Sequence, residues 1–210
     1  MQEQCATALL NKGVTLSEKL NDPQGAVAAY DDLLQRFGDS PVPGVQEQCA
    51  KALLNKGVTL NRSGKVVEAV ACYDAMLARY SHLENPAIQE QCQSALANTI
   101  EPLLVWDRKA EAIPRIHQVL ERTDNTDQQY AIMPFLLWLA EAGATPQAVL
   151  AAIRALAPEV KFTSWDWSDI RPLVDQLPEP RKTQAECFIA FFGQHHDMAT
   201  LEQCLTTIQR

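Results

Sequence analysis

The sequence predicts an all-α solenoid of helix-turn-helix repeats followed by a helical C-terminal extension. The tetrapeptide Gln-Glu-Gln-Cys occurs three times, at 2–5, 46–49 and 89–92. An internal period of this size is typical of stacked supersecondary units, each of which buries its apolar face against its neighbours. No stretch alternates apolar and polar residues as a half-buried strand does, and no Asn-Gly hairpin signal occurs. The chain is therefore expected to be helical throughout.

The three copies divide the first part of the chain into units, with offsets of 44 and 43 residues between copies. We place the three units at 1–45, 46–88 and 89–123. Residues 6–16 and 50–60 are identical except at Thr7 and Lys51. The third copy keeps the pattern but lacks the glycine, as expected where an array meets a different neighbour.

Each unit is predicted to contain two helices joined by a short turn. In the second unit the first helix is expected over 46–60 and the turn over 61–64, where Gly64 suits a helix C-terminus. The second helix carries an apolar stripe with the spacing i, i+3, i+4, i+7. The stripe consists of Val66, Ala69, Val70, Tyr73, Met76, Leu77 and Tyr80. Gly13 and Gly57 lie within first helices, where glycine costs about 1 kcal/mol relative to alanine, so they predict close helix–helix approach.

These residues and their spacing resemble the tetratricopeptide repeat family. The matching positions are Leu9, Gly13, Leu16, Ala26, Tyr30 and Leu34 in the first unit, Leu53, Gly57, Leu60, Gly64, Ala69, Tyr73 and Leu77 in the second, and Leu96, Ala112, Ile116 and Leu120 in the third. The resemblance implies a bacterial protein. The family's unit is about 34 residues long, so offsets of 44 and 43 residues between the copies indicate a long variant of the repeat. Lys12 and Lys56 depart from the family, which usually has leucine there. Pro102 is expected to kink the first helix of the third unit.

The resemblance also implies a concave groove lined by the first helices of the units. Carried over by position, the groove contains Leu10, Asn11, Val14, Leu54, Asn55, Val58 and Arg62, with Lys51 at its edge. Asparagine amides there would bind an extended peptide's backbone, and the apolar neighbours would take its side chains. The alternative is that Leu54 and Val58 pack against the adjacent unit. Leu10 and Val14 stand where members that clamp a terminal carboxylate carry lysine and asparagine, which argues against such a clamp.

Residues 124–210 are expected to form a helical extension of five helices. Trp165 and Trp167 are its most distinctive residues, and they have two interpretations. In the first, Asp166 or Ser168 caps the following helix while a tryptophan packs against the turn. In the second, a tryptophan is an exposed anchor for a partner, because this residue is enriched at interface hot spots.

No catalytic residue, cofactor site or metal site is expected. His195 and His196 lie between Cys187 and Cys204, but the set lacks the short, regular spacing of metal ligands. Cys187 lies in an apolar stretch, where burial raises the pKa of a thiol and lowers its reactivity. No phosphate-binding glycine loop is present in a chain with 8 glycines among its 210 residues.

The net charge of −8 sets the class of partner. An acidic surface repels the phosphates of nucleic acids and anionic lipids, so we expect neither nucleic acid nor a membrane as partner. A basic or mixed-charge protein or peptide is easier to accommodate. No run of about 18 apolar residues occurs, and the N-terminus does not read as a signal peptide. We therefore expect a cytoplasmic protein whose six cysteines are reduced.

The combined prediction is a non-catalytic protein–protein interaction module or scaffold that binds a peptide or helix in the concave groove. The alternative is an accessory or inhibitory protein, similar to an immunity protein, that binds a specific enzyme or toxin through residues 124–210. Met1 stands where Val45 stands in the next copy. The array therefore opens abruptly, either as part of a longer array or with an exposed first helix as a docking face. Pairing of solenoid ends into a homodimer is left open.

Overall fold

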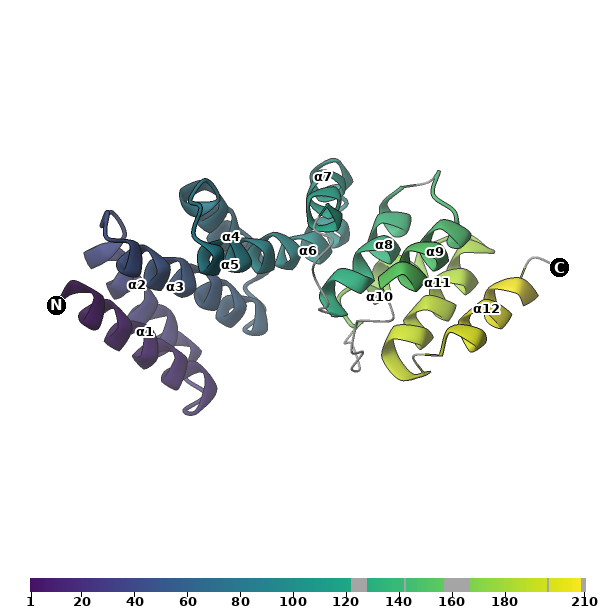
Figure 1. The fold of residues 1–210 in the computed structure, drawn as a ribbon. Coiled ribbons are helices and arrows are strands. Elements are labelled where there is room, and N and C mark those ends of the chain that lie inside the picture. The colour runs from purple at the N-terminus through teal and green to yellow at the C-terminus, as the bar shows by residue number, and fades with distance from the viewer. Residues whose placement is uncertain (122–127, 142, 157–166, 196, 209–210) are drawn as a thin grey trace. The chain divides into compact units, whose positions relative to one another are not determined.

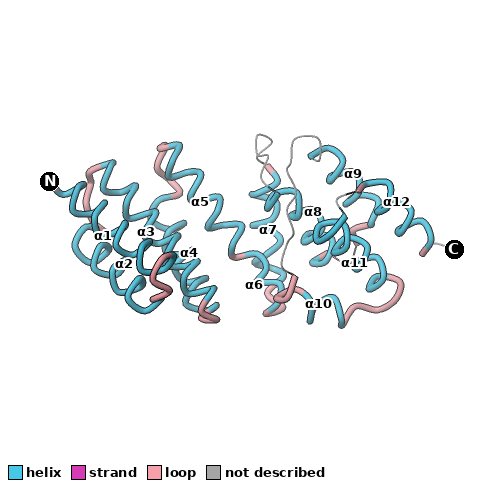
Figure 2. Tube along the Cα trace, turned by 90° about the horizontal axis from the view of Figure 1, so that it is seen from below, coloured by secondary structure: helices cyan, strands magenta, loops and turns pink. Residues whose placement is uncertain are grey.

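Helices account for every regular element that the computed structural model describes (Figures 1 and 2). The structure describes residues 1–121, 128–141, 143–156, 167–195 and 197–208. Within these ranges no strand occurs, which confirms the predicted all-α fold class. The chain divides into two units, Met1–Thr99 and Ile100–Arg210. The division falls inside the predicted third repeat, and the predicted boundary at residue 123 stays a prediction.

The first unit is built from two helical hairpins and one further helix. Its helices are α1 (Gln2–Glu18), α2 (Pro23–Phe37), α3 (Pro43–Arg62), α4 (Val66–Tyr80) and α5 (Pro86–Asn98). α1 packs against α2 and α3 against α4, while α3 also contacts α1, α2 and α5. Asp22 caps α2 by accepting a hydrogen bond from the Gly25 backbone N–H at 2.9 Å, and the Asn85 side chain caps α5. The predicted stacking of helix-turn-helix units is therefore present.

The turn between α3 and α4 shows why a glycine is needed there. Gly64 has a φ of +75°, a conformation that other residues rarely adopt. This conformation lets the Lys65 N–H donate to the Leu60 carbonyl and the Gly64 N–H donate to the Asn61 carbonyl, both at 2.9 Å. Two carbonyls at the end of α3 thereby gain partners. The turn lies at Ser63 and Gly64, so the prediction of a turn at 61–64 began two residues too early, because α3 extends to Arg62.

A glycine–tyrosine contact fixes the approach of the two helices in each hairpin. A Cβ atom at Gly13 would lie less than 3.0 Å from ring carbons of Tyr30, and one at Gly57 less than 3.0 Å from those of Tyr73. Both tyrosines are almost fully buried, with exposed fractions of 1% and 2%. The close helix–helix approach predicted from the two glycines is confirmed.

The first helix of the third repeat is split in two. α5 ends at Asn98 and α6 (Ile100–Val105) begins two residues later. Pro102 accounts for the break, because it has no N–H to donate to the Asn98 carbonyl and its ring clashes with that carbonyl. The interruption predicted from Pro102 is thus present.

The second unit contains the remaining helices. They are α6, α7 (Lys109–Leu120), α8 (Gln128–Ala140), α9 (Pro146–Leu156), α10 (Arg171–Asp175), α11 (Arg181–Ala190), a π-helical turn (Phe191–His195) and α12 (Met198–Thr207). α8 contacts α7 and α9. Its side chains from 132 to 136 are all buried, as expected for a helix that is apolar nearly all round. Thr145 and Asp197 precede α9 and α12, and their side chains accept hydrogen bonds from the first-turn N–H groups of these helices.

An aromatic cluster forms the core of the second unit. Phe135 of α8 lies at its centre, with ring centroids 5.2 Å from Phe188 and 5.5 Å from Trp167. Phe192 lies 5.9 Å from Trp167. The Arg181 guanidinium covers Trp138, which completes the cluster on another side. Such ring pairs add about 0.5–1.5 kcal/mol each beyond the apolar area that they bury.

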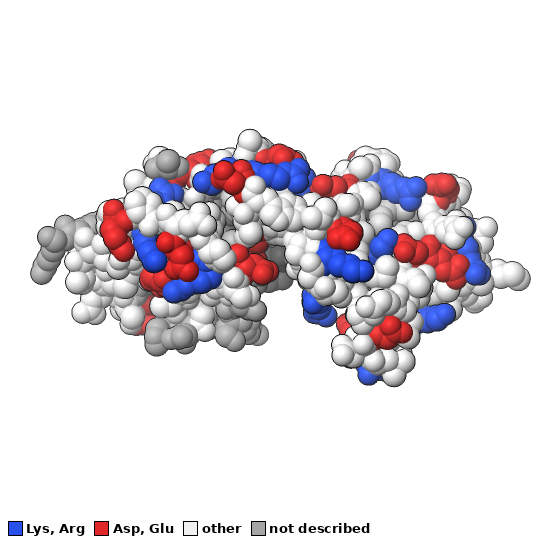
Figure 3. Space-filling view, turned by 180° about the vertical axis from the view of Figure 1, so that it is seen from behind, with Lys and Arg blue, Asp and Glu red and all other residues white. Residues whose placement is uncertain are grey.

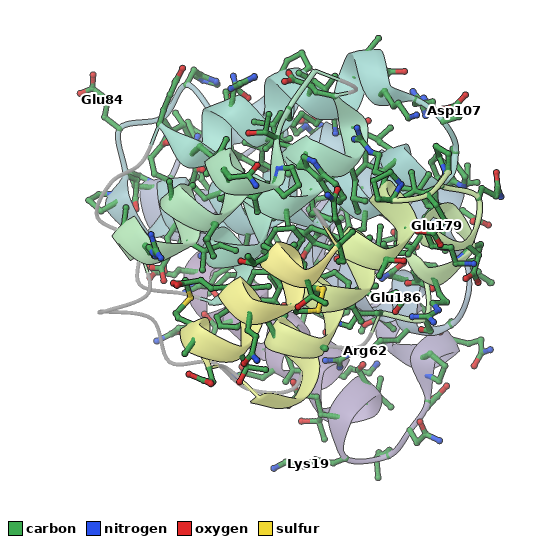
Figure 4. All side chains as sticks on the ribbon, turned by 90° about the vertical axis from the view of Figure 1, so that its right-hand side faces the viewer. Lys19, Arg62, Glu84, Asp107, Glu179 and Glu186 are labelled. Carbon is green, nitrogen blue, oxygen red and sulfur yellow. A yellow bond between two sulfur atoms is a disulfide. The ribbon has the colours of Figure 1, made fainter. Side chains whose placement is uncertain are left out.

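A disulfide bond joins Cys187 of α11 to Cys204 of α12 (Figure 4). The expectation that all six cysteines are reduced is therefore wrong for these two. The π-helical turn brings α12 back alongside α11, so residues 17 apart in sequence have a Cα–Cα distance of 6.0 Å. That distance lies within the range that a disulfide requires. Sequence spacing alone does not reveal this return of the chain.

Candidate functional site

Four of the predicted groove residues line one small recess between α1 and α3. Val14 comes from α1, and Asn55, Val58 and Arg62 come from α3. The recess has a volume of about 30 Å³. A space of that size holds about one water molecule, so by itself it takes no peptide side chain.

A wider recess of about 590 Å³ adjoins the small one. The two share four lining residues, Ser17, Glu18, Thr59 and Arg62. The wider part is completed by Asn21, Pro23, Gln24 and Ser63. We call the two together the α1/α3 recess. Its wider part has a volume typical of ligand sites, is open to solvent and exposes polar and apolar surface in about equal parts.

A hydrogen-bonded floor holds this recess in shape. The Tyr30 hydroxyl of α2 hydrogen-bonds with the side chains of Thr59 and Asn55. Thr59 donates to the Asn55 carbonyl at 2.8 Å, and its Oγ1 lies 3.2 Å from Ser17 Oγ. Burial raises the pKa of Tyr30, and the nearby Glu18 carboxylate raises it further. The hydroxyl therefore stays protonated and able to donate at neutral pH.

The same arrangement recurs one repeat later. Tyr73 of α4 hydrogen-bonds with Asn98 of α5, and burial raises the pKa of Tyr73 to about 12. Asn98 occupies the repeat position of Asn55. Asparagine at this position therefore binds the tyrosine of the preceding repeat. Asn11, the copy in α1, is exposed in the structure.

Three other predicted groove residues are held by contacts within the protein. Leu10 is 6% exposed and belongs to the apolar core of the first unit. Leu54 is half-buried and packs against the same core. Lys51 Nζ lies 2.6 Å from Glu47 Oε1 on the same helix. These side chains contribute to packing and local charge pairing, while the recess itself is lined by their neighbours.

The charges at the recess have opposite signs. Glu18 and Arg62 both line it, and both are exposed. Arg62 extends from the end of α3 (Figure 4). Over the face drawn in Figure 3, acidic and basic side chains are interspersed rather than gathered into one field. The recess therefore offers one carboxylate, one guanidinium and several neutral hydrogen-bonding groups.

The two tryptophans of the extension differ in what the structure shows. Trp165 lies outside the described residues. Trp167 is 7% exposed and packs edge-on against Phe135. Its place in the aromatic core favours the structural interpretation over the partner-anchor interpretation. The nearby α10 begins after Ile170 without a side-chain cap, and Ser168 is exposed.

Several recess residues were not among the predicted set. Ser17 continues the spacing of Leu10 and Val14 along α1 by one further turn, and Asn21 lies just beyond the end of that helix. That 3–4 periodicity was available in the sequence. Thr59 lies one residue after Val58, on the side that faces Tyr30, and only the three-dimensional packing of α2 reveals its role.

Clusters of metal-ligating side chains and membrane-spanning helices are both absent from the described part of the chain. No group of three or more His, Cys, Asp or Glu side chains is placed there to hold a metal ion. No helix among the described residues is both long and apolar enough to cross a membrane.

Residues 7–40 match the family model of the tetratricopeptide repeat. The matched segment takes in most of α1 and all of α2. This match confirms the prediction of a tetratricopeptide-type repeat protein, and the bacterial origin and long repeat unit stay predictions. No curated protein and no solved structure matches the chain.

Proposed function

We propose that this tetratricopeptide-type repeat protein is a non-catalytic interaction module that binds a peptide or helix of a partner protein in the α1/α3 recess. Repeats of this family generally mediate binding of protein partners. The observation that carries the proposal is the convergence of α1 and α3 on a recess with a rigid polar floor. Val14, Asn55, Val58 and Arg62 were predicted to line a groove, and they lie together there.

The chemistry of the recess favours an extended segment with polar and basic groups. Glu18 attracts a basic side chain, and the Arg62 guanidinium can donate hydrogen bonds to a carboxylate or a backbone carbonyl. Ser17 offers a hydroxyl group to a peptide backbone, while Val58 provides apolar contact. The overall charge of −8 also favours a basic or mixed-charge partner. Nucleic acid and membrane surfaces fit this charge poorly.

The proposal keeps the remaining groove positions as secondary contacts. Asn11 is exposed and Lys51 is half-exposed at the edge of the same helices.

We also propose a cytoplasmic location, on the grounds given in the sequence analysis. The disulfide between Cys187 and Cys204 weighs against it, because disulfides persist mainly in oxidising compartments.

The test is partner capture with two matched variants. The chain carrying Val58→Arg places a large charge in the recess, and the chain carrying Val67→Arg places the same charge on α4, where Val67 is 68% exposed. Proteins retained from the native cell lysate by the wild-type chain are identified and quantified for each variant. Circular dichroism establishes that both variants are folded.

The expected result is a partner that is retained by the wild type and by Val67→Arg and lost with Val58→Arg. A partner retained equally by all three chains would contradict recess binding. It would then favour the alternative function, an accessory or inhibitory protein that binds an enzyme or toxin through residues 124–210.

A further inference from the structure

The two cysteines of the disulfide bond differ in their access to solvent. Cys187 of α11 is only 4% exposed. Cys204 of α12 is exposed, and the bond joins the two helices in Figure 4. Disulfides that a dissolved thiol can reach are cleaved more easily than those enclosed in a core. A reducing agent therefore has access to this bond from the side of Cys204.

The helix that carries Cys204 buries few side chains. α12 has ten residues, of which Leu201 and Leu205 are buried. The helix packs against α11, α9 and the π-helical turn. An isolated helix shorter than about 12–15 residues is only marginally stable in water. α12 therefore depends on its attachment to these neighbours.

The polar contacts of α12 add little to this attachment. Glu202 pairs with Arg154 of α9, but the two side chains are 39% and 54% exposed. Exposed ion pairs contribute little, because water screens them and both side chains lose freedom. Asp197 accepts hydrogen bonds from N–H groups of α12 itself, which stabilise the helix rather than its contact with α11. The disulfide is therefore the main link between α12 and α11.

The other four cysteines of the chain are free thiols. Free thiols persist where cellular reductants keep cysteines reduced, and disulfides in such compartments are usually transient and redox-responsive. The presence of four free thiols beside one accessible disulfide therefore favours a bond that opens and closes over a permanent one.

We propose that the Cys187–Cys204 bond is a thiol-exchange site, and that its cleavage by a dithiol reductant releases α12 from α11. Release uncovers Leu201, Leu205 and the faces of α11 and of the π-helical turn against which α12 packs. The reduced second unit thereby presents an apolar surface that the oxidised unit covers. The inference does not depend on the proposed function, because the α1/α3 recess lies in the first unit.

The exchange proceeds in two steps. A thiolate of the reductant attacks the sulfur of Cys204, the sulfur–sulfur bond breaks, and its electron pair passes to the sulfur of Cys187, which takes a proton from water. The reductant is then joined to Cys204 in a mixed disulfide. Its second thiolate attacks its own sulfur in that mixed disulfide and displaces the thiolate of Cys204. The protein gains two electrons, and the reductant leaves as an intramolecular disulfide.

Thiol mapping and hydrogen exchange on the native full-length chain test this proposal. The oxidised chain is incubated with dithiothreitol in the absence of denaturant, and samples are quenched by alkylation. Mass spectrometry measures the loss of the Cys187–Cys204 bond, and amide exchange is followed separately in α12, α8 and α3. α8 reports on the rest of the second unit and α3 on the first unit.

The expected rate of reduction rises in proportion to the dithiothreitol concentration without reaching a plateau, because the reagent reaches Cys204 in the folded chain. After reduction, amide exchange in α12 becomes faster by about tenfold or more, while exchange in α8 and α3 stays unchanged. Removal of dithiothreitol and addition of oxidised glutathione restores slow exchange in α12.

Two matched variants on α12 serve as controls. Cys204→Ser removes the bond at an exposed position and leaves the buried Cys187 in place, so this variant folds. Its α12 is expected to exchange as fast as in the reduced wild type and to be insensitive to dithiothreitol. Gln203→Ser changes the neighbouring exposed residue and is expected to keep both the slow exchange and the response to dithiothreitol.

Three results would overturn the proposal. A reduction rate that levels off at high dithiothreitol concentration would show that the bond opens only when the second unit unfolds. Unchanged exchange in α12 after reduction, or in Cys204→Ser, would show that packing holds the helix without the bond. Equal acceleration of exchange in α12 and α8 would show that the bond supports the whole second unit rather than the attachment of one helix.

Discussion

At the scale of single residues, the glycine–tyrosine pairs determine how closely the helices of a hairpin approach. Glycine at position 57 is unfavourable for the α3 helix, but it lets the ring of Tyr73 lie against the backbone of α3. The hydroxyl at the far end of that ring then reaches Asn98 of the next repeat. One tyrosine therefore joins contacts within a repeat to contacts between repeats. Two predictions follow from this pair.

Gly57→Ala is expected to lower the free energy of unfolding by up to about 2 kcal/mol. The added Cβ would lie less than 3.0 Å from the ring of Tyr73, which is buried and has no space to move. Overpacking of this kind costs about 1–3 kcal/mol, partly offset by about 1 kcal/mol of helix propensity. Urea unfolding measures the change, and Gly143→Ala is the control, because no atom lies within 4 Å of its Cβ position. Additivity of Gly57→Ala and Tyr73→Ala in the double variant would contradict the contact.

Tyr73 is expected to make the first unit sensitive to alkali. Burial raises its pKa to about 12, from 10.0 for an unperturbed tyrosine. The unfolded chain therefore loses this proton first, so the stabilisation is complete below about pH 10 and is lost as pH rises toward 12. Urea unfolding at a series of pH values should show a shallower alkaline loss for Tyr73→Phe, after a reduction of about 1 kcal/mol at neutral pH from the lost hydrogen bond. Parallel pH profiles for wild type and variant would contradict this account.

The close helix approach at the glycines could be predicted from the sequence, but the hydrogen bonds that the asparagines make within the protein could not. Asn55 was predicted to face a bound peptide, and the structure shows it bonded to Tyr30. The reason is that its partner comes from the preceding repeat. Helical periodicity places a residue on a face of its own helix, but it does not specify which side chain of another helix meets it.

At the scale of secondary-structure elements, most boundaries follow from local chemistry. Proline at the first helical position starts α2, α3, α5 and α9, and Gly64 ends the α3/α4 turn. Pro102 separates α5 from α6 through the backbone of Asn98. These signals were visible in the sequence. The pairing of α11 with α12 was not, because it depends on the π-helical turn between them.

The disulfide between α11 and α12 is expected to stabilise the second unit by about 3 kcal/mol, because it closes a loop of 17 residues in the unfolded chain. Replacement of both Cys187 and Cys204 by alanine should lower the guanidinium midpoint of the second unit accordingly. Cys5→Ser is the control, since that thiol is exposed and free. Equal midpoints for the wild type without reductant and the double variant would show that the bond contributes nothing to stability.

At the scale of the whole molecule, repetition of one first-helix sequence produces two kinds of surface. In α3 and α5, which pack against α2 and α4, the helix face that carries Cys49 or Cys92 is buried. The same face of α1, which carries Cys5, is exposed. The fold class, the repeats and part of the recess could be predicted from this repetition. The shape of the recess could not be predicted, because it depends on how α1 and α3 pack around Tyr30.

Site-specific photo-crosslinking is the most direct test of whether a partner binds in the α1/α3 recess. A photoreactive amino acid is placed at Val58, in the recess, or at Val67, on the exposed side of α4. Each full-length chain is irradiated in its native cell lysate, and the adducts are identified by mass spectrometry. We expect one protein to be crosslinked through Val58 and to be absent from the Val67 sample. Arg62→Glu should lower the yield of the Val58 adduct. A partner crosslinked from Val67 but never from Val58 would contradict binding in the α1/α3 recess.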